Sequence, residues 1–156
     1  VPLPQELRAP IYAKGPGVDG QDWCRLLIER LDDVLLPDGT AYIVSDLPGQ
    51  LEEPTFTADL RRYAAQAKLS IEVIIDNRND YVEESAQFKL LGAFLARENP
   101  ELSPEECYRR VETLHKKTLG AVCSHLSVMV VRRAADLPAG VRVLNRFQRK
   151  PPGSPE

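Results

Sequence analysis

The sequence predicts an α/β fold, and three of its features support this class. Apolar residues of the segment 22–35 recur every three or four positions, which is the period of one helix face. The segment 41–44 is almost wholly apolar, as expected of a strand covered on both faces. After another helical period at 56–67, a β-branched run follows at 71–75. Helix and strand therefore alternate along the first half of the chain.

The composition is that of a globular protein without a strongly charged surface. Hydrophobic residues make up 43% of the 156 residues, charged residues make up 28%, and the net charge is −3. This balance provides no basic footprint for nucleic acid. No apolar run approaches the roughly 20 residues that cross a bilayer, so neither nucleic acid nor a membrane is expected as a partner. The three cysteines are widely spaced and odd in number, which favours a reducing, cytoplasmic location over a disulfide framework.

The first predicted helix has clear signals at both ends. Asp19 and Asp22 lie where a helix start favours carboxylates, and the proline, aspartate and glycine at 37–39 end the helix in a turn. The apolar spacing predicts that one stripe faces the core. Its members are Trp23, Leu26, Leu27, Leu31, Val34 and Leu35.

A crossover helix and a second strand are predicted next. The helix is expected to begin with Thr55 or Thr57 as its N-cap. The strand covers 70–76 and ends in the polar cluster 77–80. This cluster lies on the side where α/β sheets usually bind ligands, although a solvated turn is the favoured interpretation. The predicted inner stripe of the helix is Phe56, Leu60, Tyr63, Ala64 and Ala67.

Two helices are predicted between residues 83 and 120. The first ends before Pro100, because a residue that precedes proline disfavours the helical conformation. The second begins with a capping box formed by Ser103 and Glu106, with proline at its first position. His115 is expected to be a partly buried histidine on the face of that helix. The predicted inner stripes are Phe88, Leu91, Phe94 and Leu95, then Cys107, Tyr108, Val111, Leu114, His115 and Thr118.

The end of the chain predicts a final strand and a tail. The strand is expected at 126–131, and a short further strand is possible at 141–144. The predicted division is an α/β domain over 1–133, including a helical insertion at 83–120, and a tail over 134–156. The end of that tail, from Arg149, is expected to be disordered.

The glycines at the start of the chain allow two interpretations. Gly15, Gly17 and Gly20 match the dinucleotide fingerprint G-x-G-x-x-G, and Asp46 ends the next strand, where a ribose-binding acid would stand. The fingerprint requires a buried strand that leads directly into its first glycine. The segment 10–14 begins with a proline and makes a poor central strand. A nicotinamide-dependent oxidoreductase is therefore the less favoured alternative, and a flexible loop is the simpler one.

The motifs GPGVDG and LLPDGTAYIV, joined by an amphipathic helix, resemble the second half of a class I S-adenosylmethionine-dependent methyltransferase. The resemblance is strongest to the release-factor glutamine methyltransferases and their small-methyltransferase-domain relatives. In that group an Asn-Pro-Pro-Tyr motif precedes a proline-containing segment, which residues 1–4 resemble. Residues 17–20 resemble the glycine loop that follows, and residues 36–40 resemble the entry to the next strand. The resemblance covers residues 1–80 and extends to 126–133.

This resemblance implies the C-terminal half of a Rossmann-like methyltransferase sheet. The half has the order helix, strand, helix, strand, helical insertion and a final strand, which lies antiparallel between the two earlier ones. The family's cofactor loop, ribose acid and Asn-Pro-Pro motif would precede Val1, so S-adenosylmethionine is expected to bind in a longer protein, and this chain alone is expected to be inactive. The resemblance assigns no catalytic or cofactor-binding residue here. It assigns a substrate-side loop consisting of Val1, Pro2, Lys14, Gly15, Asp19 and Gly20.

The same resemblance implies partners. A strand at 40–47 would lie beside a missing neighbour, so the upstream half or a second copy is expected at that edge. The methyl acceptor would be a protein or a small molecule.

A further class remains open: a non-catalytic α/β module whose helices at 83–120 bind a protein. No residues have the spacing of zinc ligands. Cys123 and His125 would share a strand face but are not expected to form a catalytic pair.

Overall fold

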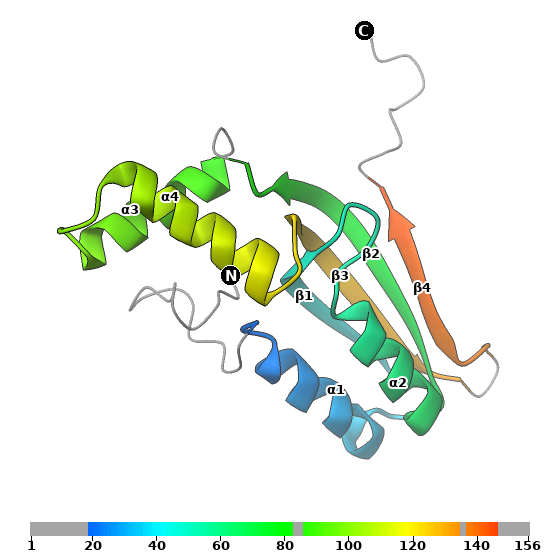
Figure 1. Cartoon of the computed structure of the whole chain (residues 1–156). Helices are drawn as coiled ribbons and strands as arrows, with labels where there is room; N and C mark the ends of the chain where they lie inside the picture. Colours follow the sequence, from blue (N-terminus) through cyan, green and yellow to red (C-terminus); the bar gives the residue numbers. More distant parts are fainter. Residues whose placement is uncertain (1–18, 83–85, 135–136, 147–156) are drawn as a thin grey trace, which may run out of the picture.

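The computed structural model describes residues 19–82, 86–134 and 137–146. Helices and strands alternate over residues 22–80, as the sequence predicts for the first half of the chain, and two helices then precede the last two strands (Figure 1). The elements are α1 (Asp22–Val34), β1 (Thr40–Gly49), α2 (Thr57–Ala67), β2 (Leu69–Asp80), α3 (Ala86–Glu98), α4 (Pro104–Thr113), the π-helical turn η2 (Leu114–Thr118), β3 (Cys123–Arg133) and β4 (Gly140–Asn145).

The described strands form one mixed sheet in the order β1-β3-β2-β4. β3 pairs antiparallel with β1 on one side and with β2 on the other, so β1 and β2 run in the same direction. This agrees with the prediction that the last long strand lies antiparallel between the two earlier ones. β4 pairs parallel with β2 at the far edge, which confirms the further strand predicted at 141–144. The sheet therefore continues past Arg133, and the tail from Arg149 lies outside the described residues.

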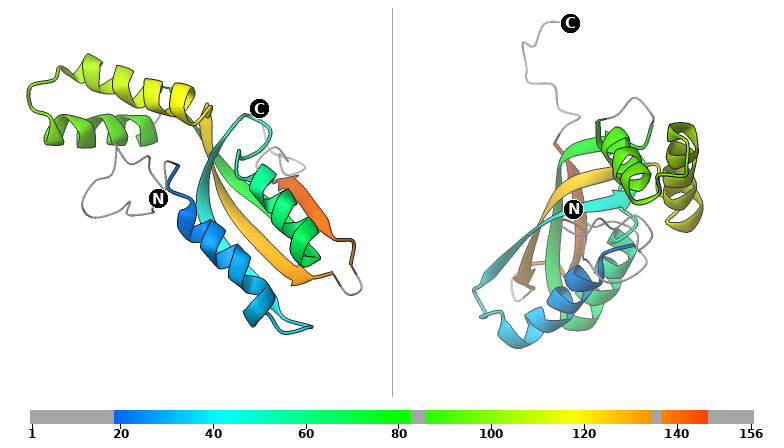
Figure 2. Two further views of the ribbon diagram at one scale, coloured as in Figure 1. Left: turned by 60° about the horizontal axis from the view of Figure 1, so that its bottom comes forward. Right: turned by 90° about the vertical axis from the view of Figure 1, so that its left-hand side faces the viewer.

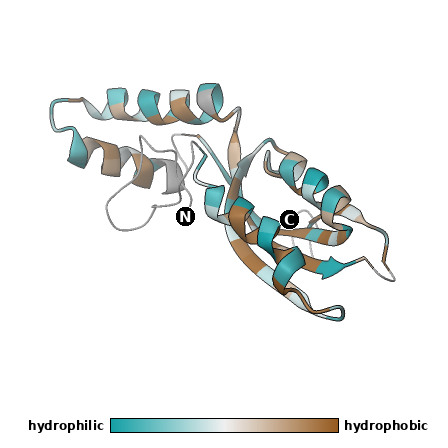
Figure 3. Cartoon of the chain, turned by 90° about the horizontal axis from the view of Figure 1, so that it is seen from below, coloured by the Kyte–Doolittle hydropathy of each residue, from teal (hydrophilic) through white to brown (hydrophobic). Residues whose placement is uncertain are grey.

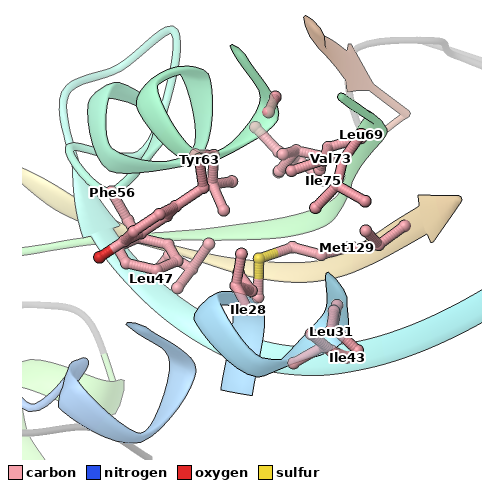
Figure 4. Close-up of a cluster of buried hydrophobic side chains, with 14 residues drawn as sticks. Ile28, Leu31, Ile43, Leu47, Phe56, Tyr63, Leu69, Val73, Ile75 and Met129 are labelled. Carbon is pink, nitrogen blue, oxygen red and sulfur yellow. The ribbon is translucent and has the colours of Figure 1, made fainter. Parts of the chain in front are cut away.

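The main core lies between the sheet and the helices α1 and α2, which cover the same face (Figure 2). Alternate residues of β1, β2 and β3 point into it, as the two-residue period of a strand requires. Fully burying one such aliphatic side chain contributes about 1.5–3 kcal/mol. The centre of the cluster, drawn in Figure 4, includes Ile28, Leu47, Phe56, Tyr63, Val73, Ile75 and Met129.

α1 buries a different face from the predicted one. Ile28 and Leu31 are its buried residues, and Cys24 and Leu35 pack beside them. The prediction was wrong because α1 carries two apolar stripes, and periodicity alone does not show which one meets the sheet. Leu31 and Leu35 were assigned correctly. The exposed members of the predicted stripe are Trp23, Leu26, Leu27 and Val34.

The start of α2 and the end of β2 also differ from the predictions. The N-cap of α2 is Phe56 rather than a threonine, and the Thr55 hydroxyl donates to the carbonyl of Pro48 (2.9 Å). The polar cluster 77–80 is no turn, because β2 continues through it to Asp80 after a register shift between Ile75 and Asn77. A polar stretch persists as a strand here because β3 supplies its backbone partners. The predicted inner stripe of α2 is confirmed for Phe56, Leu60, Tyr63 and Ala64, with Ala67 packed beside them.

α3 and α4 form a hairpin between β2 and β3 with a core of its own. Its buried members include Leu91, Leu95 and Val111. The predicted capping box is confirmed, since Ser103 and Glu106 exchange hydrogen bonds at the start of α4. His115 is buried completely rather than partly, and its ring lies 4.0 Å from that of Tyr81.

No helix in the described segments combines the length and the apolar character needed to span a bilayer.

The contact between α3 and α4 at Gly92 provides a test of this hairpin. A Cβ atom added at Gly92 would lie 2.4 Å from Cε1 of Tyr108. We expect Gly92→Ala to lower the free energy of unfolding by about 1–3 kcal/mol through overpacking, although alanine is the better helix former by about 1 kcal/mol. Urea unfolding measures the change. In a Tyr108→Ala background the same substitution should become stabilising, and an equal loss in both backgrounds would contradict this packing.

Candidate functional site at the carboxyl ends of β1 and β2

Polar residues from several elements gather where β1 and β2 end and β3 begins. β1 and β2 run in the same direction, so their carboxyl ends meet at one end of the sheet, and the antiparallel β3 starts there (Figure 1). The α3–α4 hairpin leaves β2 and returns to β3 at this same end. The residues concerned are Gln21, Asp46, Arg78, Asp80, Tyr81, Cys123, Ser124 and His125.

The loop that enters α1 is held by ion pairs. Asp19 accepts hydrogen bonds from the backbone N–H of Gln21 (3.0 Å) and from Nη1 of Arg25 (2.8 Å). Arg25 also donates to Asp59 of α2 (2.9 Å). Burial raises the pKa of Asp19, but the hydrogen bonds from Arg25 and Gln21 outweigh it and hold that pKa below its usual value. Gly20 has a φ of 75°, which favours glycine at this turn. Asp19 and Gly20 of the predicted loop therefore fix the start of α1.

Gln21 connects the start of α1 to β1. Its side chain is buried, with 1% of the residue exposed, and its Nε2 donates to the backbone carbonyl of Asp46 (3.4 Å). Its Oε1 has no hydrogen-bond partner in the described structure. Burying a carbonyl acceptor without a partner costs about 1–3 kcal/mol. Gln21 Oε1 is thus a buried acceptor that has no partner among the described residues.

Tyr81 and Ser124 form a second polar contact at this end. They are hydrogen-bonded and both are buried. Burial raises the pKa of Tyr81 well above its usual value, the nearby charge of Asp46 raises it further, and the Ser124 hydrogen bond only partly opposes these effects. The Tyr81 phenol is consequently neutral at physiological pH. It can donate or accept a hydrogen bond, but it does not act as a base.

Cys123 and His125 contact each other, with Sγ and Nε2 3.4 Å apart. Nε2 also lies 2.7 Å from the carbonyl of Gln50, to which it donates. Burial raises the pKa of Cys123 to about 11 and lowers that of His125. A buried thiol beside a neutral imidazole whose proton already points to a carbonyl is a poor nucleophile. This geometry agrees with the prediction that the pair shares a face without being arranged for catalysis.

The other residues of the predicted loop, Val1, Pro2, Lys14 and Gly15, lie outside the described part of the chain, as does Gly17 of the glycine fingerprint. Gln21, Tyr81 and Ser124 were not predicted from the sequence. A signal existed for Ser124, because serines and a histidine interrupt an otherwise apolar strand at its start. No such pattern marks Gln21, whose burial depends on its contact with β1.

The arrangement is suited to binding rather than to acid–base chemistry. Among the described residues no three histidine, cysteine or acidic side chains converge on a metal position. The side chains that converge are neutral hydrogen-bonding groups, together with the carboxylate of Asp46 and the ion pair of Arg78 and Asp80 (2.8 Å). Such groups can orient a polar ligand through hydrogen bonds and charge.

Burial of His125 predicts a pH-dependent stability. Its pKa is lowered in the folded state, so protons bind the unfolded chain more tightly, and stability should fall as the pH drops below about 6.5. Burial also lowers the pKa of His115, so this residue should likewise reduce stability as the pH falls. The pKa values of Asp19 and Glu106 are lowered, so these carboxyl groups gain their protons below this pH range and do not cause the effect.

Urea unfolding at pH 7.5, 6.5 and 5.5 tests the effect of His125. His125→Gln should flatten this pH dependence, because glutamine can still donate to the Gln50 carbonyl but does not titrate. His115→Gln removes the other buried histidine and should also flatten the pH dependence of the free energy of unfolding. If both variants keep the slope of the unsubstituted protein, the buried histidines are not its cause.

Two comparisons with known proteins find no relative of this chain. No protein-family model matches this chain, and a search of curated proteins finds no match. The function is therefore inferred from the fold and from the chemistry of the residues at this end of the sheet.

Proposed function

We propose that this chain is the substrate-side half of an S-adenosylmethionine-dependent methyltransferase, with the cofactor-binding half contributed by a segment outside it. The observation that carries the proposal is the order β1-β3-β2, in which a reversed strand lies between two parallel ones. This order is the one implied by the resemblance of residues 17–20 and 36–40 to that class. The outer edge of β1, which no other described strand pairs with, gives the cofactor half a strand to pair with.

The described residues fit the acceptor side of such a reaction better than the cofactor side. Asp46, at the carboxyl end of β1, lies close enough to Tyr81 to raise the pKa of its phenol, and the backbone carbonyl of Asp46 is engaged by Gln21. No described loop offers the glycine-rich backbone that would cradle the cofactor. S-adenosylmethionine, when bound by the other half, would supply the methyl group. The role proposed for this chain is to bind and orient the acceptor.

Methyl transfer to an amide nitrogen depends mainly on alignment of the nitrogen with the methyl group. Carbonyl acceptors that hold the N–H groups supply that alignment. Gln21 Oε1 is an acceptor of this kind, buried and without a partner in the described structure. Neutral Tyr81 supplies a further hydrogen-bonding group at the same end of the sheet. We propose that these two side chains position the acceptor.

The α3–α4 hairpin supports a polypeptide as the acceptor, although a small molecule fits the polar site equally. The hairpin projects beyond the end of the sheet where the site lies (Figure 1). One hollow on it is bordered by Leu95, Leu114, Arg109 and Arg110. Apolar, cationic and acidic groups around one hollow, Glu106 among them, suit a polypeptide better than a compact polar metabolite.

A non-catalytic interaction module is the second candidate. The observation that favours it is the separate core of the hairpin, which leaves the outer faces of α3 and α4 free of the main sheet. In this alternative the hairpin binds a protein and no methyl group is transferred. The nicotinamide alternative depends on Gly15 and Gly17, which lie outside the described residues.

The cofactor requirement can be measured directly. Calorimetric titration of this chain with S-adenosylmethionine should show no binding tighter than about millimolar, which corresponds to about 4 kcal/mol. A protein that also includes the segment encoded upstream of Val1 should bind it in the micromolar range. Saturable micromolar binding to the chain alone would refute the division into halves. The same titration with NADH tests the nicotinamide alternative. Micromolar NADH binding that Asp46→Ala weakens would establish the oxidoreductase instead.

Methyl transfer by the longer protein tests the role of Gln21. With tritiated S-adenosylmethionine and a cell extract as the source of acceptors, we expect Gln21→Leu to raise the KM for the acceptor, or to lower kcat, by at least tenfold. Cofactor affinity should stay unchanged. Gln66→Leu makes the same change at an exposed position of α2 and is the matched control, which should leave both constants unaltered. Binding of the cofactor without any methyl transfer would favour the interaction module.

A further inference from the structure

Among the residues that the structure describes, no strand pairs with the outer edge of β1, and this free edge is open over a short stretch. On the side away from β3, the carbonyl of Pro48 accepts from the backbone N–H of Thr55 (3.0 Å), and the carbonyl of Asp46 accepts from Gln21 (3.4 Å). Backbone groups of every second residue point to the same side of a strand. The N–H and C=O groups of Tyr42 and Val44 therefore point to the free edge as well, whereas those of Ile43 point to β3.

Exposed apolar side chains lie on both sides of this edge. On the sheet face that α1 and α2 leave open, Tyr42 is 68% exposed and Val44 is 69% exposed. On the other face, α1 carries Trp23, Leu27 and Val34, which are 62%, 44% and 67% exposed. Figure 3 shows the hydropathy of the chain, with hydrophobic and hydrophilic residues mixed along the helices. Large exposed apolar groups that gather along an unpaired strand indicate an interaction surface.

The contacts of α1 show where its exposed stripe points. Arg25 and Glu29 face α2, where they bond Asp59 (2.9 Å) and Tyr63 (2.8 Å). Ile28 faces the sheet. At about 100° per residue, Trp23, Leu27 and Val34 fall on the side opposite to Arg25 and Glu29. Because α2 lies toward the middle of the sheet, this stripe overhangs the free edge of β1 (Figure 2).

We infer that this surface binds a second copy of the chain through antiparallel pairing of β1 with β1. A two-fold axis at Ile43, perpendicular to the sheet, places Tyr42 opposite Val44 of the second copy, and Val44 opposite its Tyr42. The two residues whose backbone groups point outward then form the ladder. Each cross-strand pair joins an aromatic to a β-branched side chain, a favourable combination.

The helices match the same two-fold axis. α1 and β1 run in opposite directions because a short turn joins them, so pairing of the strands also brings the two α1 helices side by side and antiparallel on one face. Trp23 of one copy then meets Val34 of the other. Arg30 and Asp33, which form an ion pair on the exposed side of α1 (3.4 Å), carry opposite charges. A two-fold interface requires such a self-complementary patch.

The size of the patch sets the expected strength. A standard interface buries about 800 Å² on each partner. This patch consists of five exposed side chains and the backbone of two outward-pointing residues, so the area that it buries should lie at the lower end of that range. We expect a dissociation constant in the micromolar range. The dimer would form from this chain by itself and does not depend on methyl transfer. A cofactor half that pairs with β1 would compete with the second copy for the same edge.

Sedimentation velocity from about 1 to 300 μM, which brackets a micromolar dissociation constant, tests the pairing on the 156-residue chain. We expect a reversible equilibrium between monomer and dimer. Val44→Lys should weaken dimerisation at least tenfold, and Trp23→Ser should weaken it independently from the helix side. Leu126→Lys, on the same open sheet face but on the central strand β3, is the matched control and should leave dimerisation unchanged. Circular dichroism confirms that each variant is folded.

Hydrogen exchange supplies a second measurement that does not depend on substitutions. As the dimer forms, exchange should slow at the amides of Tyr42 and Val44, whereas the amide of Ile43, which faces β3, should stay equally protected at all concentrations. A chain that stays monomeric over the whole concentration range would overturn the inference. So would a dimer that Leu126→Lys disrupts and Val44→Lys does not. Neither result changes whether S-adenosylmethionine binds, so this inference and the methyltransferase proposal fail separately.

Discussion

The antiparallel position of β3 between β1 and β2 is the constraint on which the other features depend. β3 pairs with β1 from Thr40 to Gly49 and with β2 from Leu69 to Asp80. Since β3 runs against both, the chain must reverse after β2, and the α3–α4 hairpin makes that reversal at one end of the sheet. The start of β3 is thereby placed against the carboxyl ends of β1 and β2. The polar cluster is a consequence of this ladder rather than of any local motif.

Local signals predicted the elements well, and non-local pairing explains the failures. The capping box of Ser103 and Glu106 and the strand around Ile43 depend on neighbours in sequence, and both form as predicted. The prediction that this strand is covered on both faces was wrong, because Tyr42 and Val44 lie exposed on the face that α1 and α2 leave open. The choice between the two apolar stripes of α1 depends on which residues meet the sheet, which periodicity does not encode. The extension of β2 through Asp80 depends on backbone partners supplied by β3. Propensity favoured a turn there, and tertiary pairing overrode it.

The candidate site shows the same division. The glycine-rich loop was the natural place to look, because glycines and carboxylates before a helix are visible in the sequence. In the structure Asp19 is committed to Arg25, which in turn holds Asp59, so this loop fastens α1 to α2. The groups with unusual chemistry, Tyr81 and Ser124, meet only because the hairpin returns β3 to the end of β2. Residues 81 and 124 are distant in sequence, so only the fold could identify them as a pair.

The open edge of β1 and the polar site are physically linked through Gln21. Its Nε2 donates to the carbonyl of Asp46, which closes the open edge at one end, while its Oε1 is buried without a partner among the described residues. The same residue begins α1, whose exposed stripe overhangs that edge. Any strand that pairs with β1 would therefore pack against α1 and constrain the orientation of the Gln21 amide. Pairing at the edge of β1 and the position of the Gln21 side chain are therefore coupled, whichever strand occupies that edge.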